Sequence, residues 1–152
     1  MRPGVRLAVD VGDVRVGVAV SDPAGVLATP LTVLARDRKR GGDLDDIAAL
    51  VIEREVVEVV VGLPRSLSGS DGPAARAAHD YAARLATQVA PVPVRLVDER
   101  LSTAEAARGL RAAGRSSRAS RGVIDSAAAV VILQHALDTE RATGAIPGQA
   151  AL

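Results

Sequence analysis

The sequence has no cysteine, no phenylalanine and no tryptophan, and it has a single tyrosine. The lack of cysteine excludes disulfide bridges, thiolate metal sites and cysteine nucleophiles, and it suits a reducing compartment. We find neither a signal pattern at the amino terminus nor an uncharged apolar run of the roughly 18 residues that a membrane helix needs. We therefore expect a soluble, cytoplasmic protein without a membrane partner.

Charge is nearly balanced, because 19 basic and 18 acidic residues give a formal net charge of +1 over 152 residues. Its distribution is uneven. No acid lies between Glu105 and Asp125, where five arginines occur: Arg108, Arg111, Arg115, Arg118 and Arg121. A second basic cluster consists of Arg36, Arg38, Lys39 and Arg40. Such clusters bind phosphates in some proteins and are merely solvated in others. With so few aromatic side chains, a nucleic-acid ligand would be recognised through backbone charge and shape.

The stretch from Leu7 to Asp22 places one carboxylate, Asp10, inside an alternating apolar run. The alternation breaks only at Gly12-Asp13, which predicts a two-residue hairpin turn with Asp10 opposite Arg15. One face of this hairpin is then apolar, and the other carries small residues around Asp10. An ordinary cross-strand ion pair between Asp10 and Arg15, contributing under about 1 kcal/mol, explains the pattern equally well.

The remaining chain alternates between patterns typical of strands and of helices. Strands are predicted at 25–34, 56–61 and 94–98, and helices at 43–52, 73–89, from 102 to about 114, and 123–143. We expect Pro30 to lie in an edge strand and Asp43 to cap a helix. Antiparallel strands followed by alternating helices and strands predict one α/β domain over residues 1–143, with a mixed sheet covered by helices. Residues 115–122 are expected to be mobile, and the tail 144–152 to be disordered.

Three carboxylates lie where a carboxylate is locally unfavourable: Asp10 in mid-strand, Glu99 where a strand gives way to a helix, and Asp125 in the first turn of an apolar helix. A position at the rim of the protein explains Glu99, and the helix dipole explains Asp125. If the three converge, they repel one another unless cations neutralise them, and Mg²⁺ or Mn²⁺ suits an all-oxygen ligand set. Two such ions can activate water and stabilise the leaving oxygen of a phosphodiester. A strand ending at Gly62, between those of Asp10 and Glu99, would start the two acids about 10 Å apart and leave room for ions.

Four blocks of sequence occur together in a characteristic order: Asp10-Val11-Gly12 through Ser21-Asp22, Val61-Gly62-Leu63-Pro64 with Ser68-Gly69-Ser70, Asp98-Glu99-Arg100-Leu101-Ser102-Thr103, and Ile124-Asp125 through Gln134. On these blocks the chain resembles the YqgF (RuvX) family of the ribonuclease H-like superfamily, over about residues 7–137. The resemblance implies a five-stranded sheet in the order 3-2-1-4-5, with the first three strands antiparallel. It also implies a magnesium-dependent nuclease whose metal ligands are Asp10, Glu99 and Asp125, with Arg15 and Arg100 beside the site.

Several functions are open at this point. The first is an endonuclease that matures the 5′ end of the 16S ribosomal RNA precursor, with the backbone positioned by Arg15, Arg100 and the arginines from Arg108 to Arg121. The second is a Holliday junction resolvase acting on four-way DNA. A third is a nucleic-acid-binding module that does not cleave, although clustered acids would weaken phosphate binding. An actin-like ATPase is disfavoured, because such proteins close two domains around a nucleotide and this chain has one. The sequence does not decide whether the substrate is RNA or DNA, or whether the protein is a monomer or a homodimer.

Overall fold

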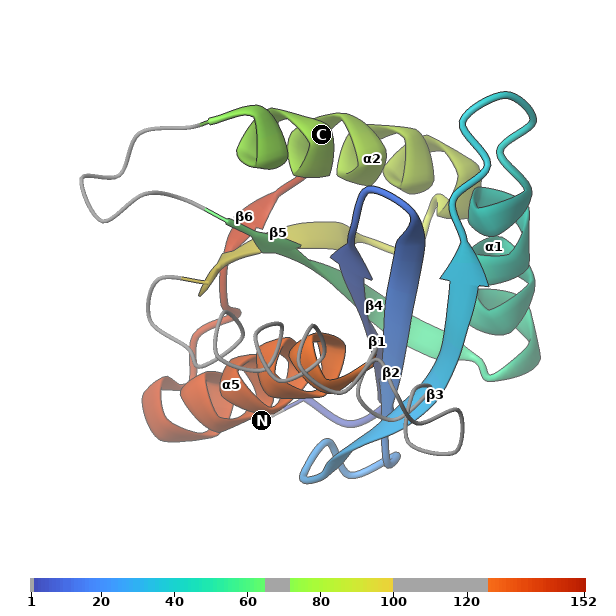
Figure 1. The fold of residues 1–152 in the computed structure, drawn as a ribbon. Coiled ribbons are helices and arrows are strands. Elements are labelled where there is room, and N and C mark those ends of the chain that lie inside the picture. The colour runs from blue at the N-terminus through green and yellow to red at the C-terminus, as the bar shows by residue number, and fades with distance from the viewer. Residues whose placement is uncertain (1, 65–71, 100–125) are drawn as a thin grey trace, which may run out of the picture.

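The computed structural model describes residues 2–64, 72–99 and 126–152. Within these residues the chain forms a six-stranded mixed sheet in the order β3-β2-β1-β4-β5-β6 (Figure 1). The strands are β1 (Val5–Val11), β2 (Arg15–Ser21), β3 (Ala28–Ala35), β4 (Val56–Leu63), β5 (Val94–Asp98) and β6 (Gln149–Ala150), and the helices are α1 (Gly42–Glu53), α2 (Pro73–Val89) and α5 (Ala127–Thr143). β1, β2 and β3 are antiparallel, whereas β1, β4 and β5 run parallel. The predicted α/β class and the strand order 3-2-1-4-5 are confirmed.

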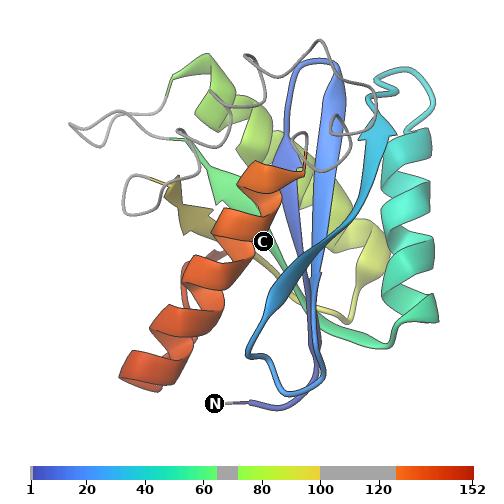
Figure 2. The same ribbon diagram turned by 60° about the horizontal axis from the view of Figure 1, so that its bottom comes forward.

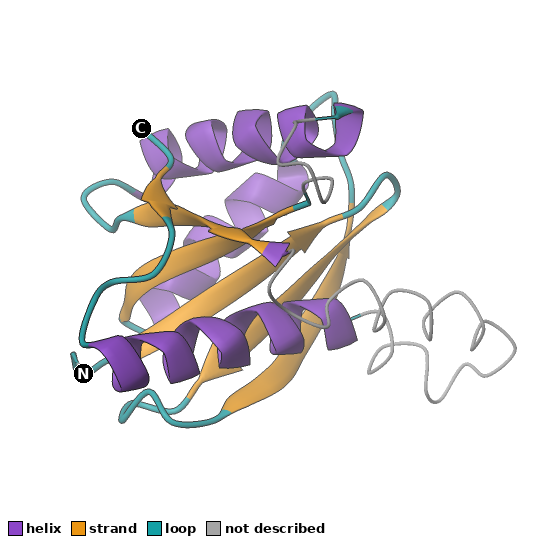
Figure 3. Cartoon of the chain, turned by 90° about the vertical axis from the view of Figure 1, so that its left-hand side faces the viewer, coloured by secondary structure: helices purple, strands orange, loops and turns teal. Residues whose placement is uncertain are grey.

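Three layers make up the described part of the molecule, with α1 and α2 on one face of the sheet and α5 on the other (Figure 3). The face toward α1 and α2 carries large aliphatic side chains such as Leu7, Val9 and Val18. The face toward α5 carries small ones such as Ala8 and Ala19. α5 therefore packs directly against β1 and β2. Figure 2 shows this helix in front of the sheet.

The hairpin between β1 and β2 differs from its predicted register by two residues. Val11 pairs with Val16 and Asp10 with Gly17, because the two-residue turn consists of Asp13 and Val14 and not of Gly12 and Asp13. The N–H of Gly12 donates to the carbonyl of Arg15 at 2.9 Å, and Val14 lies outside the ladder with 67% of its surface exposed. A shift of two residues keeps every side chain on its predicted face. It does place Gly17 opposite Asp10, where Arg15 was predicted.

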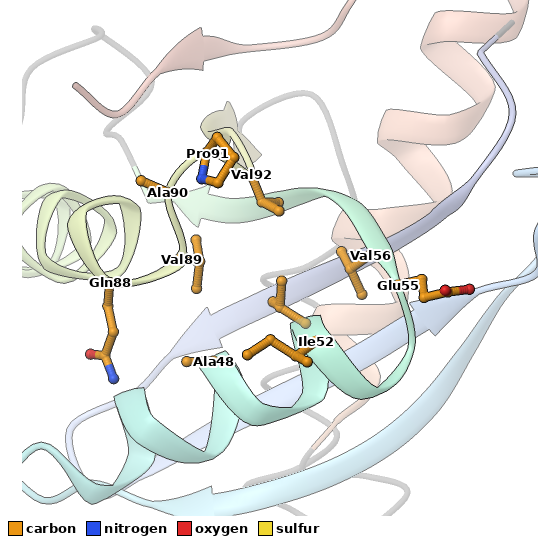
Figure 4. Close-up of a pocket in the computed structure, with 10 residues that line it drawn as sticks. Ala48, Ile52, Glu55, Val56, Gln88, Val89, Ala90, Pro91 and Val92 are labelled. Carbon is orange, nitrogen blue, oxygen red and sulfur yellow. The ribbon is translucent and has the colours of Figure 1, made fainter.

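Helix α1 begins differently from the prediction. Its N-cap is Gly41, whose φ of 68° is left-handed. Asp43 does not cap the helix, because its side chain is buried and accepts a hydrogen bond from the hydroxyl of Tyr81 at 2.9 Å. At the other end Ile52, the last residue of the predicted helix, is 80% exposed. It lines an open apolar groove of about 430 Å³ between the carboxyl-terminal ends of α1 and α2 (Figure 4).

The segment after α5 also differs from the prediction, which was a disordered tail beside a five-stranded sheet. Gln149 and Ala150 form β6 and pair with β5. The Arg95 side chain donates to the carbonyls of Pro147 at 2.7 Å and Gly148 at 2.5 Å, which holds this segment at the edge of the sheet. Side-chain to backbone bonds of this kind leave no periodic signal in the sequence. The helix predicted from residue 102, the mobile segment predicted at 115–122 and the start of the helix predicted from 123 lie outside the described residues.

A network of charged side chains anchors α5 to the sheet at the end remote from Asp10. Arg6 of β1 is 2% exposed and lies 3.0 Å from Glu140 of α5, while Arg2 binds both Glu140 and Glu58 of β4. Burial by itself would raise the pKa of Glu140, but the hydrogen bonds and charges of Arg2 and Arg6 hold that pKa below its usual range. The network fixes α5 on the face of the sheet that carries Asp10. None of the helices in the part of the chain that the structure describes is long and apolar enough to cross a membrane.

Candidate active site

Asp10 lies near the carboxyl end of β1 on the face of the sheet that α5 covers, and it is 1% exposed. Both neighbouring strands present glycine at its level. Gly17 of β2 is its cross-strand partner. On the other side Val9 pairs with Val61 of β4, so the next residues along the two parallel strands, Asp10 and Gly62, lie level with each other. The predicted floor of small residues around this carboxylate is therefore present, and two glycines form its nearest parts.

Glu99 follows β5 directly and is 6% exposed. Its carboxylate lies over Gly62, because a Cβ built on Gly62 would be 3.1 Å from Glu99 Cδ and closer still to Oε1. The same Cβ would be 2.5 Å from Cδ1 of Ile132, which belongs to α5. The sequence suggested that Gly62 leaves room for ions. In the structure the Glu99 carboxylate and the end of Ile132 fill this space, so the glycine makes room for an acid.

Two of the three predicted acids therefore lie on one face of the sheet. Asp10 comes from β1, and Glu99 reaches from β5 to β4, the strand between them. The carboxyl ends of these parallel strands meet at one edge of the sheet, which is where α/β proteins commonly bind ligands. Burying two carboxylates in a largely apolar layer is unfavourable unless cations or hydrogen-bond donors compensate their charge. The two buried acids at this edge of the sheet therefore require compensating cations or hydrogen-bond donors.

The third predicted acid, Asp125, lies outside the described residues, which resume at Ser126. Ser126 is 1% exposed, and its carbonyl accepts the N–H of Val130 in the first turn of α5. Within residues 2–64, 72–99 and 126–152, no group of three or more histidine, cysteine or acidic side chains could hold a metal ion. The candidate site in these residues consists of Asp10 and Glu99.

Among the predicted phosphate contacts, the structure describes Arg15 alone. It is exposed at the start of β2, and its partner in the ladder with β3 is Ala35. The other predicted contacts lie outside the described residues: Arg100, Arg108, Arg111, Arg115, Arg118 and Arg121.

The chemistry of Asp10 and Glu99 fits a hard divalent ion such as Mg²⁺ or Mn²⁺. Both donors are carboxylates, and such ions prefer oxygen ligands. The two glycines remove side chains that would otherwise fill the space beside the acids. His79 and His135 lie on α2 and α5 and are only partly buried. A carboxylate site of this kind is therefore the one that the described residues support.

A polar cluster that the sequence did not reveal lies beneath the β1–β2 turn. Arg36 follows β3, donates to the carbonyl of Gly12 at 2.7 Å, and has its guanidinium 5.3 Å from the centre of the Tyr81 ring. Tyr81 in turn donates to Asp43, and both side chains are buried. Burial and this hydrogen bond raise the pKa of Tyr81 well above its ordinary value. The cluster joins β3, α1 and α2 to the turn that follows Asp10.

Comparison with known proteins gives a consistent result. A family model described as "RuvX: Holliday junction resolvase" matches residues 4–139. A protein of Nocardioides sp. is 57% identical over 154 residues, covering 98% of this chain and 97% of that protein, and its name is "Putative pre-16S rRNA nuclease". A protein of Thermobifida fusca with the same name is 57% identical over 156 residues, covering 98% and 96%. Among solved structures, Thermus thermophilus RuvC in complex with a Holliday junction substrate has a TM-score of 0.53 at 18% identity, covering 97% and 99%. That likeness bears on the fold alone.

Proposed function

Because the chain belongs to the RuvX family, we propose that it is a metal-dependent endonuclease that matures the 5′ end of the 16S ribosomal RNA precursor. Relatives more than 50% identical over nearly the whole chain are named for this RNA. The ribonuclease H-like fold, shared with RuvC, is one that carries nucleases. The observation that supports the chemistry best is the pair of buried carboxylates, Asp10 and Glu99, on a floor cleared by Gly17 and Gly62.

In this proposal Asp10 and Glu99, together with Asp125, hold Mg²⁺ or Mn²⁺. Bound ions of this type supply a nucleophile from water at neutral pH and stabilise the charge of the leaving oxygen. Asp10 is fixed by its place in a central strand, and Glu99 by its packing over Gly62 against Ile132. Both carboxylates are thus positioned before a substrate arrives, which reduces the cost of ordering them. α5 covers them on one side and limits the access of water.

The substrate backbone is positioned by arginines. We assign phosphate contacts to Arg15 and Arg100 beside the acids, and to the five arginines from Arg108 to Arg121. We further propose that residues 1–143, together with strand β6 of the following segment, act as one nuclease domain in the cytoplasm. An enzyme that cuts a single RNA strand needs only one site and can act as a monomer, whereas a junction resolvase needs a symmetric dimer so that two sites face two strands.

The test compares two substrates with one pair of variants. A 16S precursor RNA and a four-way DNA junction are incubated with the wild type, Asp10→Asn, and Asp46→Asn as a matched control. Asp46 is exposed on α1, so the same chemical change is made away from the site. We expect cleavage of the RNA that requires Mg²⁺ or Mn²⁺, is lost in Asp10→Asn and is retained in Asp46→Asn.

The family description supports one alternative, a Holliday junction resolvase. Symmetric cleavage of the junction, with the RNA left intact, would assign that function. Equal cleavage by the wild type and Asp10→Asn would remove both nuclease functions. Binding without cleavage of either substrate, with or without divalent ions, would identify a binding module.

A further inference from the structure

A strongly basic loop connects β3 to α1 at the same edge of the sheet as the β1–β2 turn (Figure 1). This loop, residues 36–41 and hereafter the basic loop, contains four basic residues and one acid in six positions. Its last three basic side chains, those of Arg38, Lys39 and Arg40, are exposed. A concentration of positive charge in so short a segment attracts polyanions such as a phosphodiester backbone.

The single acid of the basic loop serves the loop's own backbone. The Asp37 carboxylate accepts the N–H of Arg40 at 3.0 Å and the N–H of Gly42 at 3.3 Å. The Asp37 carbonyl accepts the N–H of Gly41 at 2.9 Å. These hydrogen bonds lower the pKa of Asp37, most strongly the one from Arg40. The loop therefore has a defined conformation that turns Lys39 and Arg40 into solvent.

Contacts with the β1–β2 turn place the basic loop beside the candidate active site. Arg36 donates to the Gly12 carbonyl at 2.7 Å, and Arg38 donates to the Asp13 carbonyl at 3.3 Å. Gly12 is two residues beyond Asp10, or about 7 Å along the strand. The Asp13 carboxylate is exposed and lies 4.0 Å from the Arg38 guanidinium, so it offsets part of the charge of Arg38. Lys39 and Arg40 are then the residues most available to an anion.

Arg15 extends the positive charge from the basic loop toward the site. It pairs in the β2–β3 ladder with Ala35, the residue directly before Arg36. Exposed basic side chains therefore follow one another along this edge, from the start of β2 to the start of α1. A nucleic-acid strand lying on the acids could continue over this edge without meeting a covering helix in the described residues.

We propose that the basic loop is a binding site for the phosphodiester backbone of the substrate, with Lys39 and Arg40 as its principal contacts. The inference rests on the proposed nuclease function and adds a second contact region to it. Because the loop offers charged side chains and no aromatic platform, it binds backbone phosphates irrespective of base sequence. Arg36, stacked on Tyr81 and bonded to Gly12, is a positioning residue that fixes the loop relative to the acids.

The test measures binding separately from cleavage. A fluorescein-labelled single-stranded RNA of about 20 nucleotides and a labelled four-way DNA junction are titrated by anisotropy, in EDTA, over a range of salt concentrations. The double variant Lys39→Ala/Arg40→Ala is compared with the wild type and with Arg54→Ala/Arg141→Ala. The control removes the same charge from exposed positions at the far ends of α1 and α5.

Each phosphate contact to a single strand contributes about −0.7 to the slope of log K against log salt. At 0.1 M salt this equals about fivefold in affinity per contact, so the loop variant should bind the RNA about 25-fold more weakly. Its salt slope should become shallower by about 1.4, and the control should match the wild type. In the presence of Mg²⁺ the loop variant should show a raised KM with kcat retained.

Wild-type affinity and salt slope in the loop variant would overturn the inference, as would an equal loss in the control. If the loop variant loses affinity for the four-way junction but not for the RNA, the basic loop contacts branched DNA, and the proposal is contradicted for RNA. If the wild type binds neither probe, the proposed function itself fails. A wild type that binds, with a loop variant that binds equally, refutes the loop site and leaves the nuclease function standing.

Discussion

Gly62→Ala tests whether this glycine exists to seat the Glu99 carboxylate. The added Cβ would lie 2.5 Å from Ile132 Cδ1 and closer still to Glu99 Oε1, whereas ordinary contact begins at 3.4 Å. The Glu99 carboxylate must therefore move by about 1 Å or more. Both obstructing atoms are ends of flexible side chains, so we expect the free energy of unfolding to fall only by about 1 kcal/mol, the low end for overpacking.

The effect on catalysis should be much larger, because a displacement of about 1 Å in a catalytic group can reduce the rate by about 10²-fold. The assays are thermal unfolding, where about 1 kcal/mol lowers the Tm by about 2–4 °C for a chain of this size, and metal-dependent cleavage. Gly72→Ala is the matched control, since a Cβ there meets no atom within 4 Å. Unchanged cleavage by Gly62→Ala would refute the argument, and so would a loss of cleavage fully explained by unfolding.

Further predictions concern the groups that hold the site in place. Glu140→Gln leaves the buried Arg6 without its ionic partner and should lower the free energy of unfolding by about 3 kcal/mol, measured by urea denaturation at neutral pH. The folded-state pKa of Glu140 lies below the unfolded value of about 4.5. The stability that the Glu140 carboxylate contributes is therefore complete above about pH 4.5 and is lost as the pH falls through the folded-state pKa. An acid unfolding transition in Glu140→Gln identical to that of the wild type would contradict this assignment. Tyr81 is the only tyrosine, so at about pH 11 the native protein should show almost no phenolate absorbance, while the unfolded chain should show about nine-tenths of it. Because its folded-state pKa is raised, Tyr81 contributes stability that is complete below its unfolded pKa near 10.0 and is lost as the pH rises further. Tyr81→Phe should cost about 1–3 kcal/mol by leaving the buried Asp43 without this donor, and a urea midpoint equal to that of the wild type would count against it.

The hairpin shows how far the sequence determines the fold. Alternation of apolar and small residues assigns Asp10 and Gly17 to one face, and the structure agrees. The pairing within that face depends on which residues form the turn, and Val14 is apolar enough to be taken for a strand residue although it lies in the turn and is exposed. The predicted register is wrong by two residues for this reason. Local pattern fixes the face, and turn geometry fixes the partner.

Contacts between distant segments explain the other differences. Ile52 is apolar and lies in the predicted helix, but it lines the open groove between the ends of α1 and α2 and is exposed. Asp43 is predicted to be a helix cap because it directly precedes the helix. Its side chain instead accepts a hydrogen bond from Tyr81, which lies 38 residues later in the sequence. Arg95 holds β6 through two backbone carbonyls, and no property of the tail itself predicts that pairing.

The candidate site was partly predictable because unfavourable positions stand out in a sequence. An acid in mid-strand and an acid at a strand end are visible as Asp10 and Glu99, and the structure places both on the α5 face of the sheet. The space beside Gly62 was predicted to hold metal ions, but the Glu99 carboxylate occupies it. The sequence could not show that Glu99 folds back over the neighbouring strand. The assignment of Asp125 as the third ligand stays a prediction.

The proposed function depends on a divalent ion held by Asp10 and Glu99, and calorimetric titration with Mn²⁺ measures its binding without any substrate. The wild type, Asp10→Asn, Glu99→Gln and the exposed control Asp46→Asn are titrated under identical conditions. We expect each site variant to weaken Mn²⁺ binding by more than about 100-fold, the upper limit for changes beyond the direct ligands, while the control binds as the wild type does. Binding of Mn²⁺ by Asp10→Asn with wild-type affinity would contradict this expectation.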